Sequence, residues 1–288
     1  IEDLLALRQR LLLDESGLDD VGASARTVGI PLTMFAVEQL PFWRTLLNRC
    51  GFAVMLSDPS NKKIVQAGLD AVVAEPCFPI IAAHGHVANI AAKGVDYILM
   101  PNVISMETRW MHCESHLCPW HQTMPFVCRQ APALAHCAER FLTPTVRFRD
   151  GQKAVFEALK RFFKPLGVRP ATLQAALDAA YEAQTNFQAN IHAAGKRALG
   201  RLSETREAGI VLVGRPYNTH DAGMNLSVGY KLRETYGVNV LPMDFLDLNT
   251  VDIRDVNPNM FWNLGRRIIS AAKIVARHDN LHILYITN

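Results

Sequence analysis

An internal repeat limits the folds open to this chain more than any other feature of its sequence. Two apolar runs occur twice, as Val28-Gly29-Ile30-Pro31 and Val213-Gly214-Arg215-Pro216, and as Val54-Met55-Leu56-Ser57-Asp58 and Val240-Leu241-Pro242-Met243-Asp244. Between the runs, each copy has a helical pattern that ends at a glycine, Gly51 or Gly237, and glycine suits the left-handed residue that closes a helix. Each copy therefore predicts strand, helix, strand, with parallel pairing through a right-handed crossover.

The repeat predicts an α/β protein of two Rossmann-like, three-layer lobes with parallel sheets, joined by a helical spacer. We expect an N-terminal helical segment at 1–25, a first lobe at 26–150, a spacer at 151–207 and a second lobe at 208–288. One apolar stripe at helical spacing marks the spacer: Leu173, Leu177, Ala180, Phe187, Ile191, Ala194 and Ala198. The second lobe is expected to be truncated, because the chain stops as a strand-like run ends.

Further elements follow from shorter patterns. Apolar runs predict strands at 71–74, 95–100, 123–128, 145–148 and 281–287. Helical patterns begin near Ser60 and cover 84–93, 133–140 and 260–277.

Composition excludes several classes of protein. The 288 residues are 49% hydrophobic and 20% charged, which is typical of a globular chain. The net charge is only +3 and no run of Lys or Arg occurs, so nucleic-acid binding is not expected. No apolar stretch approaches the roughly 20 residues that cross a membrane. The six cysteines are scattered, which favours a reducing compartment, the cytoplasm, over a disulfide scaffold.

Two cysteines stand in short motifs, Glu75-Pro76-Cys77-Phe78-Pro79 and His116-Leu117-Cys118-Pro119. The first motif comes after an expected strand at 71–74 and before an expected helix, and the second follows the expected strand at 95–100, in a long loop at about 102–122 between expected strands. Backbone N–H groups at a helix start favour a thiolate, and open α/β sheets place working groups at the carboxyl ends of strands. Cys77 and Cys118 are therefore expected to converge on one metal site. The alternative for each is a structural cysteine that is buried or has no partner.

Histidines accompany these cysteines. His84 and His86 are expected to open a helix, where they either orient a ligand or cap and solvate the helix end. The 112–121 segment holds three His and two Cys, a composition that could bind zinc, although a second closely spaced Cys pair is missing. No Gly-rich phosphate loop is present, so an ATP site is not predicted in this chain.

Taken together, these motifs resemble the activase-related domain of the 2-hydroxyacyl-CoA dehydratase and double-cubane iron–sulfur protein family. The matching features are Gly29-Ile30-Pro31, Pro41-Phe42-Trp43, Gly51-Phe52, Leu56-Ser57-Asp58-Pro59-Ser60, Glu75-Pro76-Cys77-Phe78-Pro79, His84-Gly85-His86-Val87, Lys93-Gly94-Val95-Asp96-Tyr97-Ile98, Cys118-Pro119 and Gly214-Arg215-Pro216-Tyr217. They follow one another in order along most of the chain.

The resemblance implies an iron–sulfur module that passes low-potential electrons to a small-molecule or acyl-CoA acceptor. Cys77 and Cys118 would be two of three cysteine ligands of a 4Fe-4S or double-cubane cluster, with the third in a loop beyond Asn288 and Cys113 as an extra thiol. ATP would be used in an activase portion or protein outside this chain. The oligomeric state is left open, and a homodimer is one alternative. The alternative is a bilobal α/β module that binds a ligand or partner without a cluster.

Overall fold

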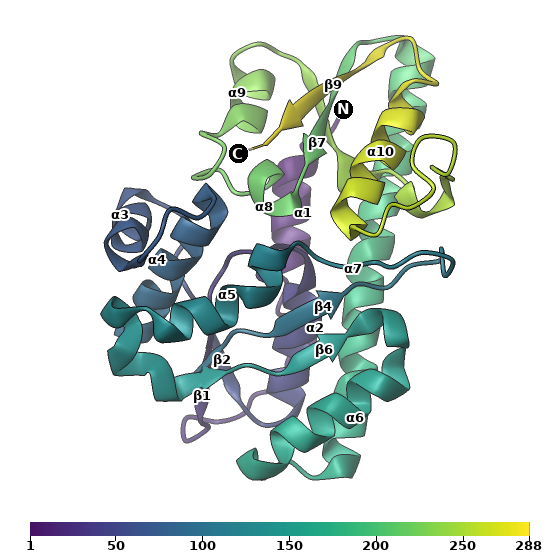
Figure 1. Cartoon of the computed structure of the whole chain (residues 1–288). Helices are drawn as coiled ribbons and strands as arrows, with labels where there is room; N and C mark the ends of the chain where they lie inside the picture. Colours follow the sequence, from purple (N-terminus) through teal and green to yellow (C-terminus); the bar gives the residue numbers. More distant parts are fainter. Residues whose placement is uncertain (288) are drawn as a thin grey trace. The chain divides into compact units, whose positions relative to one another are not determined.

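The chain folds as a mixed α/β protein whose paired strands are all parallel, which confirms the predicted Rossmann-like class (Figure 1). The computed structural model describes residues 1–287. Two compact units are present. Unit 1 comprises Ile1–Leu13, Thr108–His116 and Thr185–Asn288, and unit 2 comprises Asp14–Glu107 and Leu117–Gln184.

Unit 2 is built on a four-stranded sheet of order β2-β1-β3-β5 and a two-stranded sheet of β4 and β6. The strands are β1 (Thr27–Ile30), β2 (Ala53–Leu56), β3 (Tyr97–Leu99), β4 (Asn102–Ser105), β5 (Phe141–Leu142) and β6 (Thr145–Arg147). The helices are α2 (Ala36–Arg49), α3 (Lys62–Ala71), α4 (Phe78–Ala92), α5 (Pro119–Gln130) and α6 (Gln152–Phe163), with 3-10 turns η1 (Pro132–Arg140), η2 (Phe148–Asp150) and η3 (Lys164–Leu166).

An aromatic cluster forms part of the core of unit 2. Phe42 and Trp43 of α2 are 2% and 0% exposed, and the Phe42 ring lies 5.2 Å from the rings of both Phe148 and Tyr181. The contacts are edge-to-face, the arrangement that aromatic quadrupoles favour. The Pro41-Phe42-Trp43 motif is therefore a packing element, and Tyr181 anchors the first part of the long helix α7 (Pro170–Thr205) to α2.

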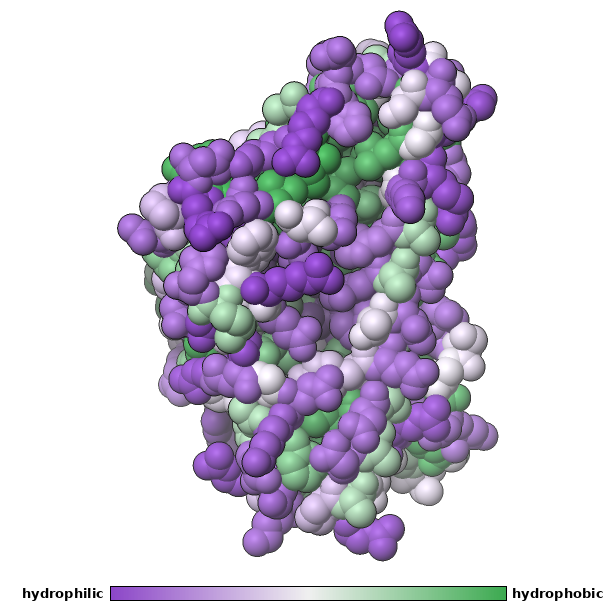
Figure 2. All heavy atoms as spheres, turned by 90° about the vertical axis from the view of Figure 1, so that its right-hand side faces the viewer, coloured by the Kyte–Doolittle hydropathy of each residue, from purple (hydrophilic) through white to green (hydrophobic). Residues whose placement is uncertain are grey.

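Unit 1 contains a three-stranded sheet of order β8-β7-β9. Its elements are α1 (Leu4–Leu13), β7 (Gly209–Gly214), α8 (Pro216–Thr219), α9 (Val228–Glu234), β8 (Asn239–Pro242), η4 (Met243–Phe245), η5 (Leu248–Thr250), α10 (Asn263–Val275) and β9 (Leu281–Ile286), with the rest of α7. α10 packs against β7 and β9, while α1 and α9 pack against β8 (Figure 1). Apolar side chains still reach the surface here: Ile283 and Tyr285 of β9 are 43% and 51% exposed. Figure 2 shows green apolar patches among the purple polar surface.

The sequence repeat corresponds to a repeated topology. In both sheets the first strand of the repeat is central and pairs in parallel with the second, β1 with β2 and β7 with β8. Gly51 has φ of 87° and Gly237 has φ of 65°, so both adopt the left-handed conformation that was predicted. The predicted apolar stripe of the spacer is confirmed as the buried side of α7, from Leu173 to Ala198.

Two predicted strands are wrong. The 71–74 run begins at Ala71, the last residue of α3, and continues as a bend in which Val73 is 71% exposed, so it does not pair in a sheet. The 123–128 run is helical, in α5, because its buried residues Met124 and Cys128 recur at the i, i+4 spacing of a helix. The strands at 95–100, 145–148 and 281–287 are present as β3, β6 and β9.

The two units divide the chain differently from the predicted segments. The chain passes from one unit to the other after Leu13, Glu107, His116 and Gln184, so α7 contributes to both. Backbone hydrogen bonds define the crossing between the units after His116. The N–H and C=O of His116 bond to Phe261 O and Asn263 N within unit 1, whereas the N–H of Leu117 bonds to Ile104 O within unit 2. Within residues 1–287, no helix has the length and apolarity that crossing a membrane requires.

Candidate functional site

Cys77 and Cys118 occupy matching positions in unit 2. Each is the N-cap of a helix, Cys77 of α4 and Cys118 of α5, and α4 and α5 lie side by side (Figure 1). Their backbones are nearly identical, with φ and ψ of −60° and 150° at Cys77 and −65° and 152° at Cys118. A proline in the first turn, Pro79 or Pro119, loses no hydrogen bond there and fixes the helix start.

The N-cap position provides donors for a sulfur ligand. Cys118 Sγ accepts a hydrogen bond from the backbone N–H of His121 at 3.4 Å. The orphan N–H groups of a helix start also carry partial positive charge, which stabilises an anion beside them. Both cysteine residues are partly exposed. Each can therefore be reached by a ligand or metal while staying tied to a rigid helix.

The other cysteines of unit 2 have a different environment. Burial raises the pKa of Cys50 to about 12 and also raises the pKa of Cys128 and of Cys137. Cys50 follows the last turn of α2, where the dipole disfavours an anion. Cys128 and Cys137 are buried packing residues, and Cys50 lies at the end of a helix that disfavours a thiolate, which leaves Cys77 and Cys118 as the pair in unit 2 suited to metal chemistry.

The path by which Cys77 reaches its position differs from the prediction. Cys77 follows the C-terminus of α3 through an extended turn, because the expected strand at 71–74 is not formed. The prediction that Cys77 lies at a helix start is correct, but the strand expected to lead to it is absent. Cys118 does come after β3 and β4, through a loop that ends where α5 begins.

His84 and His86 lie in the interior of α4 and do not open it, since the helix already begins at Phe78. His84 is 1% exposed, and its Nδ1 lies 2.7 Å from Ile80 O. His86 is fully buried between two hydroxyls, with Nδ1 2.7 Å from Ser57 Oγ and Nε2 2.8 Å from Ser60 Oγ. Burial lowers the pKa of His86 to about 4. His86 therefore ties α4 to Ser57 and Ser60, whereas the hydrogen bond of His84 lies within α4 itself.

Gly85, between these histidines, explains the motif. A Cβ on Gly85 would lie 1.9 Å from Ile64 O, and a Cβ on Gly68 would lie 2.1 Å from Ile81 O. α3 and α4 therefore cross with their backbones in contact at two glycines, which no larger residue permits. The His-Gly-His sequence is a helix-crossing motif.

The expected zinc segment, 112–121, belongs to both units. Residues up to His116 lie in unit 1 and Cys118 and His121 lie in unit 2. His121 is 5% exposed, and burial lowers its pKa to about 4. Cys113 Sγ lies 3.5 Å from Trp110 O. Across residues 1–287, no three His, Cys, Asp or Glu side chains are grouped so as to hold a metal ion. The zinc alternative gains no support.

Unit 1 contains a buried charge cluster that the sequence did not reveal. Arg8 Nε lies 2.5 Å from Asp244 Oδ2, and His220 Nε2 lies 3.1 Å from Asp244 Oδ1. Burial alone would raise the pKa of Asp244, but attraction to His220 and Arg8 holds it well below its usual value. Asp244 follows the carboxyl end of β8, where α/β sheets place functional groups. The available signal was the repeat, which pairs Asp244 with Asp58.

A family comparison covers both copies of the repeat. The model of the family described as "CoA enzyme activase uncharacterised domain" matches residues 27–246. The chain belongs to this family. The matched stretch runs from the first residue of β1 to just past η4 and includes Cys77 and Cys118, so it confirms the activase-related resemblance. Comparisons with curated proteins and with solved structures found no match.

Proposed function

We propose that this member of the CoA enzyme activase-related family is the iron–sulfur part of an ATP-dependent activase or dehydratase system. It would pass low-potential electrons to a small-molecule or acyl-CoA acceptor. The observation that carries the proposal is the matched placement of Cys77 and Cys118, two partly exposed cysteines at the starts of neighbouring helices. Thiolates are the usual ligands of such clusters.

The donor set fits part of a cluster site. A cubane is held by four ligands, usually thiolates, and Cys77 and Cys118 would supply two. Since residues 1–287 hold no three-ligand group, the remaining ligands would come from outside these residues. When bound, a cluster supplies a one-electron redox centre. The helix starts would orient the thiolates and donate N–H groups to sulfur, which tunes the potential and fixes the ligands.

The partners follow from the same proposal. ATP would be hydrolysed by an activase portion or protein, because this chain has no Gly-rich phosphate loop. The family description names a CoA enzyme, and this supports an acyl-CoA thioester as one acceptor. The cytoplasm stays the predicted compartment.

Anaerobic reconstitution with iron and sulfide tests the proposal. The protein is expected to bind iron and to show the broad visible absorption of a cubane, and Cys77→Ser or Cys118→Ser should abolish both. Cys50→Ser is the matched control, because Cys50 lies in the same unit but at the C-terminal end of a helix; this variant should keep its cluster. Full iron binding by both the Cys77 and Cys118 variants would refute the assignment.

The competing function is a module that binds a ligand or partner without a cluster. It is favoured by the lack of a three-ligand group within residues 1–287. Iron analysis of protein purified anaerobically separates the two, because the redox proposal requires stoichiometric iron and the alternative requires none.

A further inference from the structure

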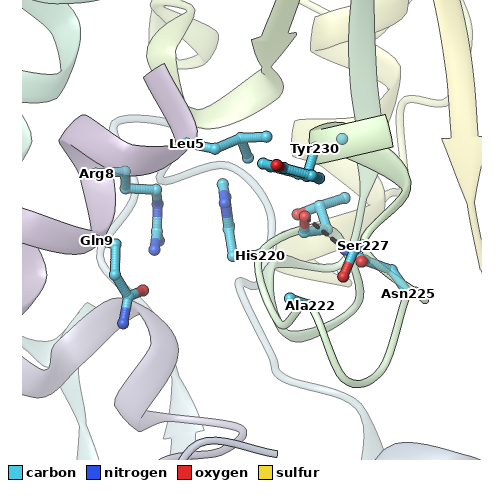
Figure 3. A pocket seen from close by; sticks show the side chains of 10 residues that line it. Leu5, Arg8, Gln9, His220, Ala222, Asn225, Ser227 and Tyr230 are labelled. Carbon is cyan, nitrogen blue, oxygen red and sulfur yellow. Dashed lines mark hydrogen bonds between the residues drawn. The ribbon is translucent and has the colours of Figure 1, made fainter. Parts of the chain in front are cut away.

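A cavity of about 210 Å³ adjoins the buried charge cluster of unit 1. Figure 3 shows Leu5 and Arg8 entering from α1, Asn225, Ser227 and Tyr230 on the opposite side, and His220 between them. An apolar cavity of about 150 Å³ is enough for benzene. This cavity therefore has room for a molecule somewhat larger than benzene.

Arg8 and His220 present N–H groups to the cavity, and both side chains are also bonded to Asp244, which does not line it. Among the described residues that line the cavity, there is no Asp or Glu. Arg8 is only 2% exposed, so its interactions are poorly screened by water. Guanidinium and imidazole N–H groups form their strongest hydrogen bonds with carboxylates. The Arg8 and His220 side of the cavity therefore suits a carboxylate.

Asn225, on the other side of the cavity, presents a hydrogen-bond acceptor. Its Nδ2 donates to the backbone oxygens of Asn218 and Thr219 at 3.0 and 2.9 Å. Its Oδ1 is buried and accepts no hydrogen bond from any residue in 1–287. A buried acceptor without a donor is costly, and a ligand hydroxyl would satisfy it. Between the two ends, Leu5 and the Tyr230 ring offer apolar contact.

The loop that carries Asn225 is held in a costly conformation. Leu226 and Ser227 have φ of 54° and 58°, in the left-handed region that non-glycine residues avoid. Asp221 Oδ1 accepts from the N–H groups of Gly223 and Met224 at 2.9 and 3.2 Å and so fixes the start of this loop. Such strain is found where a binding site fixes its groups in advance.

We infer that this cavity binds a small organic carboxylate with an apolar body and a hydroxyl at its far end. The carboxylate accepts hydrogen bonds from the Arg8 guanidinium and lies beside His220, the hydroxyl donates to Asn225 Oδ1, and the body lies against Leu5 and Tyr230. All these residues belong to unit 1, so the site is independent of Cys77 and Cys118 and of the redox proposal.

Calorimetric titration of the full chain with 4-hydroxybenzoate tests this inference. We expect binding in the millimolar range or tighter, as is usual for a ligand of this size. Benzoate, which lacks the hydroxyl, should bind about fivefold more weakly. 4-Hydroxybenzyl alcohol, which lacks the charge, should bind at least about tenfold more weakly. Tyramine, a cation, should not bind. Absence of 4-hydroxybenzoate binding, or equal affinity for tyramine, would overturn the inference.

Two surface variants locate the site without disturbing the buried cluster. Tyr230→Ser should weaken 4-hydroxybenzoate at least about fivefold, since Tyr230 is 62% exposed and contributes a wall of the cavity. Ala222→Trp should block binding by filling the cavity. Tyr236→Ser is the matched control, at a tyrosine that is 72% exposed and outside the cavity, and should bind normally. Unchanged affinity in both cavity variants would place the ligand elsewhere and contradict the proposal.

Discussion

At the scale of single residues, two histidines of unit 2 lie where a positive charge is costly. His86 is enclosed by Ser57 and Ser60, and His121 is buried in the first turn of α5. Burial lowers the pKa of each to about 4, from an ordinary 6.5. Both are therefore neutral in the folded protein at pH values where they are charged in the unfolded chain.

This difference predicts a pH dependence of stability. Between pH 4 and 6.5 the unfolded chain binds more protons than the folded one, so the free energy of unfolding rises with pH in this window. Lowering the pH from 7 to 5 should reduce it by about 2 kcal/mol for each histidine. Urea unfolding at the two pH values measures the effect.

A His86→Gln variant should lose about half of this dependence, whereas His136→Gln, at an exposed position of the same unit, should keep all of it. Equal pH dependence in the wild type and the His86 variant would show that this histidine is not the titrating group.

At the scale of elements, close backbone contacts decide which glycines matter. A Cβ on Gly195 of α7 would lie 2.0 Å from Phe245 O, whereas a Cβ on Gly200 of the same helix would meet nothing within 4 Å. The sequence cannot distinguish these two glycines, because the neighbour that excludes a side chain is distant along the chain.

The two glycines should therefore respond to alanine in opposite directions. Gly200→Ala should raise the free energy of unfolding by about 0.5–1 kcal/mol, since alanine favours a helix. Gly195→Ala should lower it by about 1–3 kcal/mol, because the backbones of α7 and η4 would have to move apart. Chemical denaturation followed by circular dichroism measures both. A stabilised Gly195 variant would mean that this contact is looser than described.

The predictable part of the fold is the part encoded locally. The repeat, the closing glycines and the stripe of α7 depend on near neighbours, and each is confirmed. The 71–74 and 123–128 runs were wrong because burial, which comes from distant segments, determines whether an apolar run pairs in a sheet. For the same reason Asp244 could not be linked to Arg8 from the sequence, and the metal-binding role of Cys77 and Cys118 stays a prediction from their motifs.

At the scale of the whole molecule, each unit is assembled from segments that are not consecutive. α1 packs against β8 and buries Leu4, Arg8 and Leu12, although more than half of the chain separates these elements. No pattern within residues 1–13 indicates which sheet they will cover. The first helix is therefore part of the core of unit 1.

Leu4→Ala should lower the free energy of unfolding by about 2–5 kcal/mol, because Leu4 is fully buried. Amide hydrogen exchange should become faster in β7 and β8 in particular. Leu226→Ala, at a 75% exposed position of the same unit, should change stability by less than about 0.5 kcal/mol. Unaltered protection of β7 and β8 in the Leu4 variant would show that α1 is dispensable for this sheet.

The passage at His116 has a consequence for the proposed ligand that follows it. His116 is hydrogen-bonded on both sides within unit 1, and Leu117 is anchored to β4 in unit 2. The chain therefore passes from unit 1 to unit 2 one residue before Cys118. Cys77, between the end of α3 and the start of α4, is far along the chain from any such passage. For the proposed cluster, a change in the backbone at His116 would therefore act on the Cys118 ligand and not directly on Cys77.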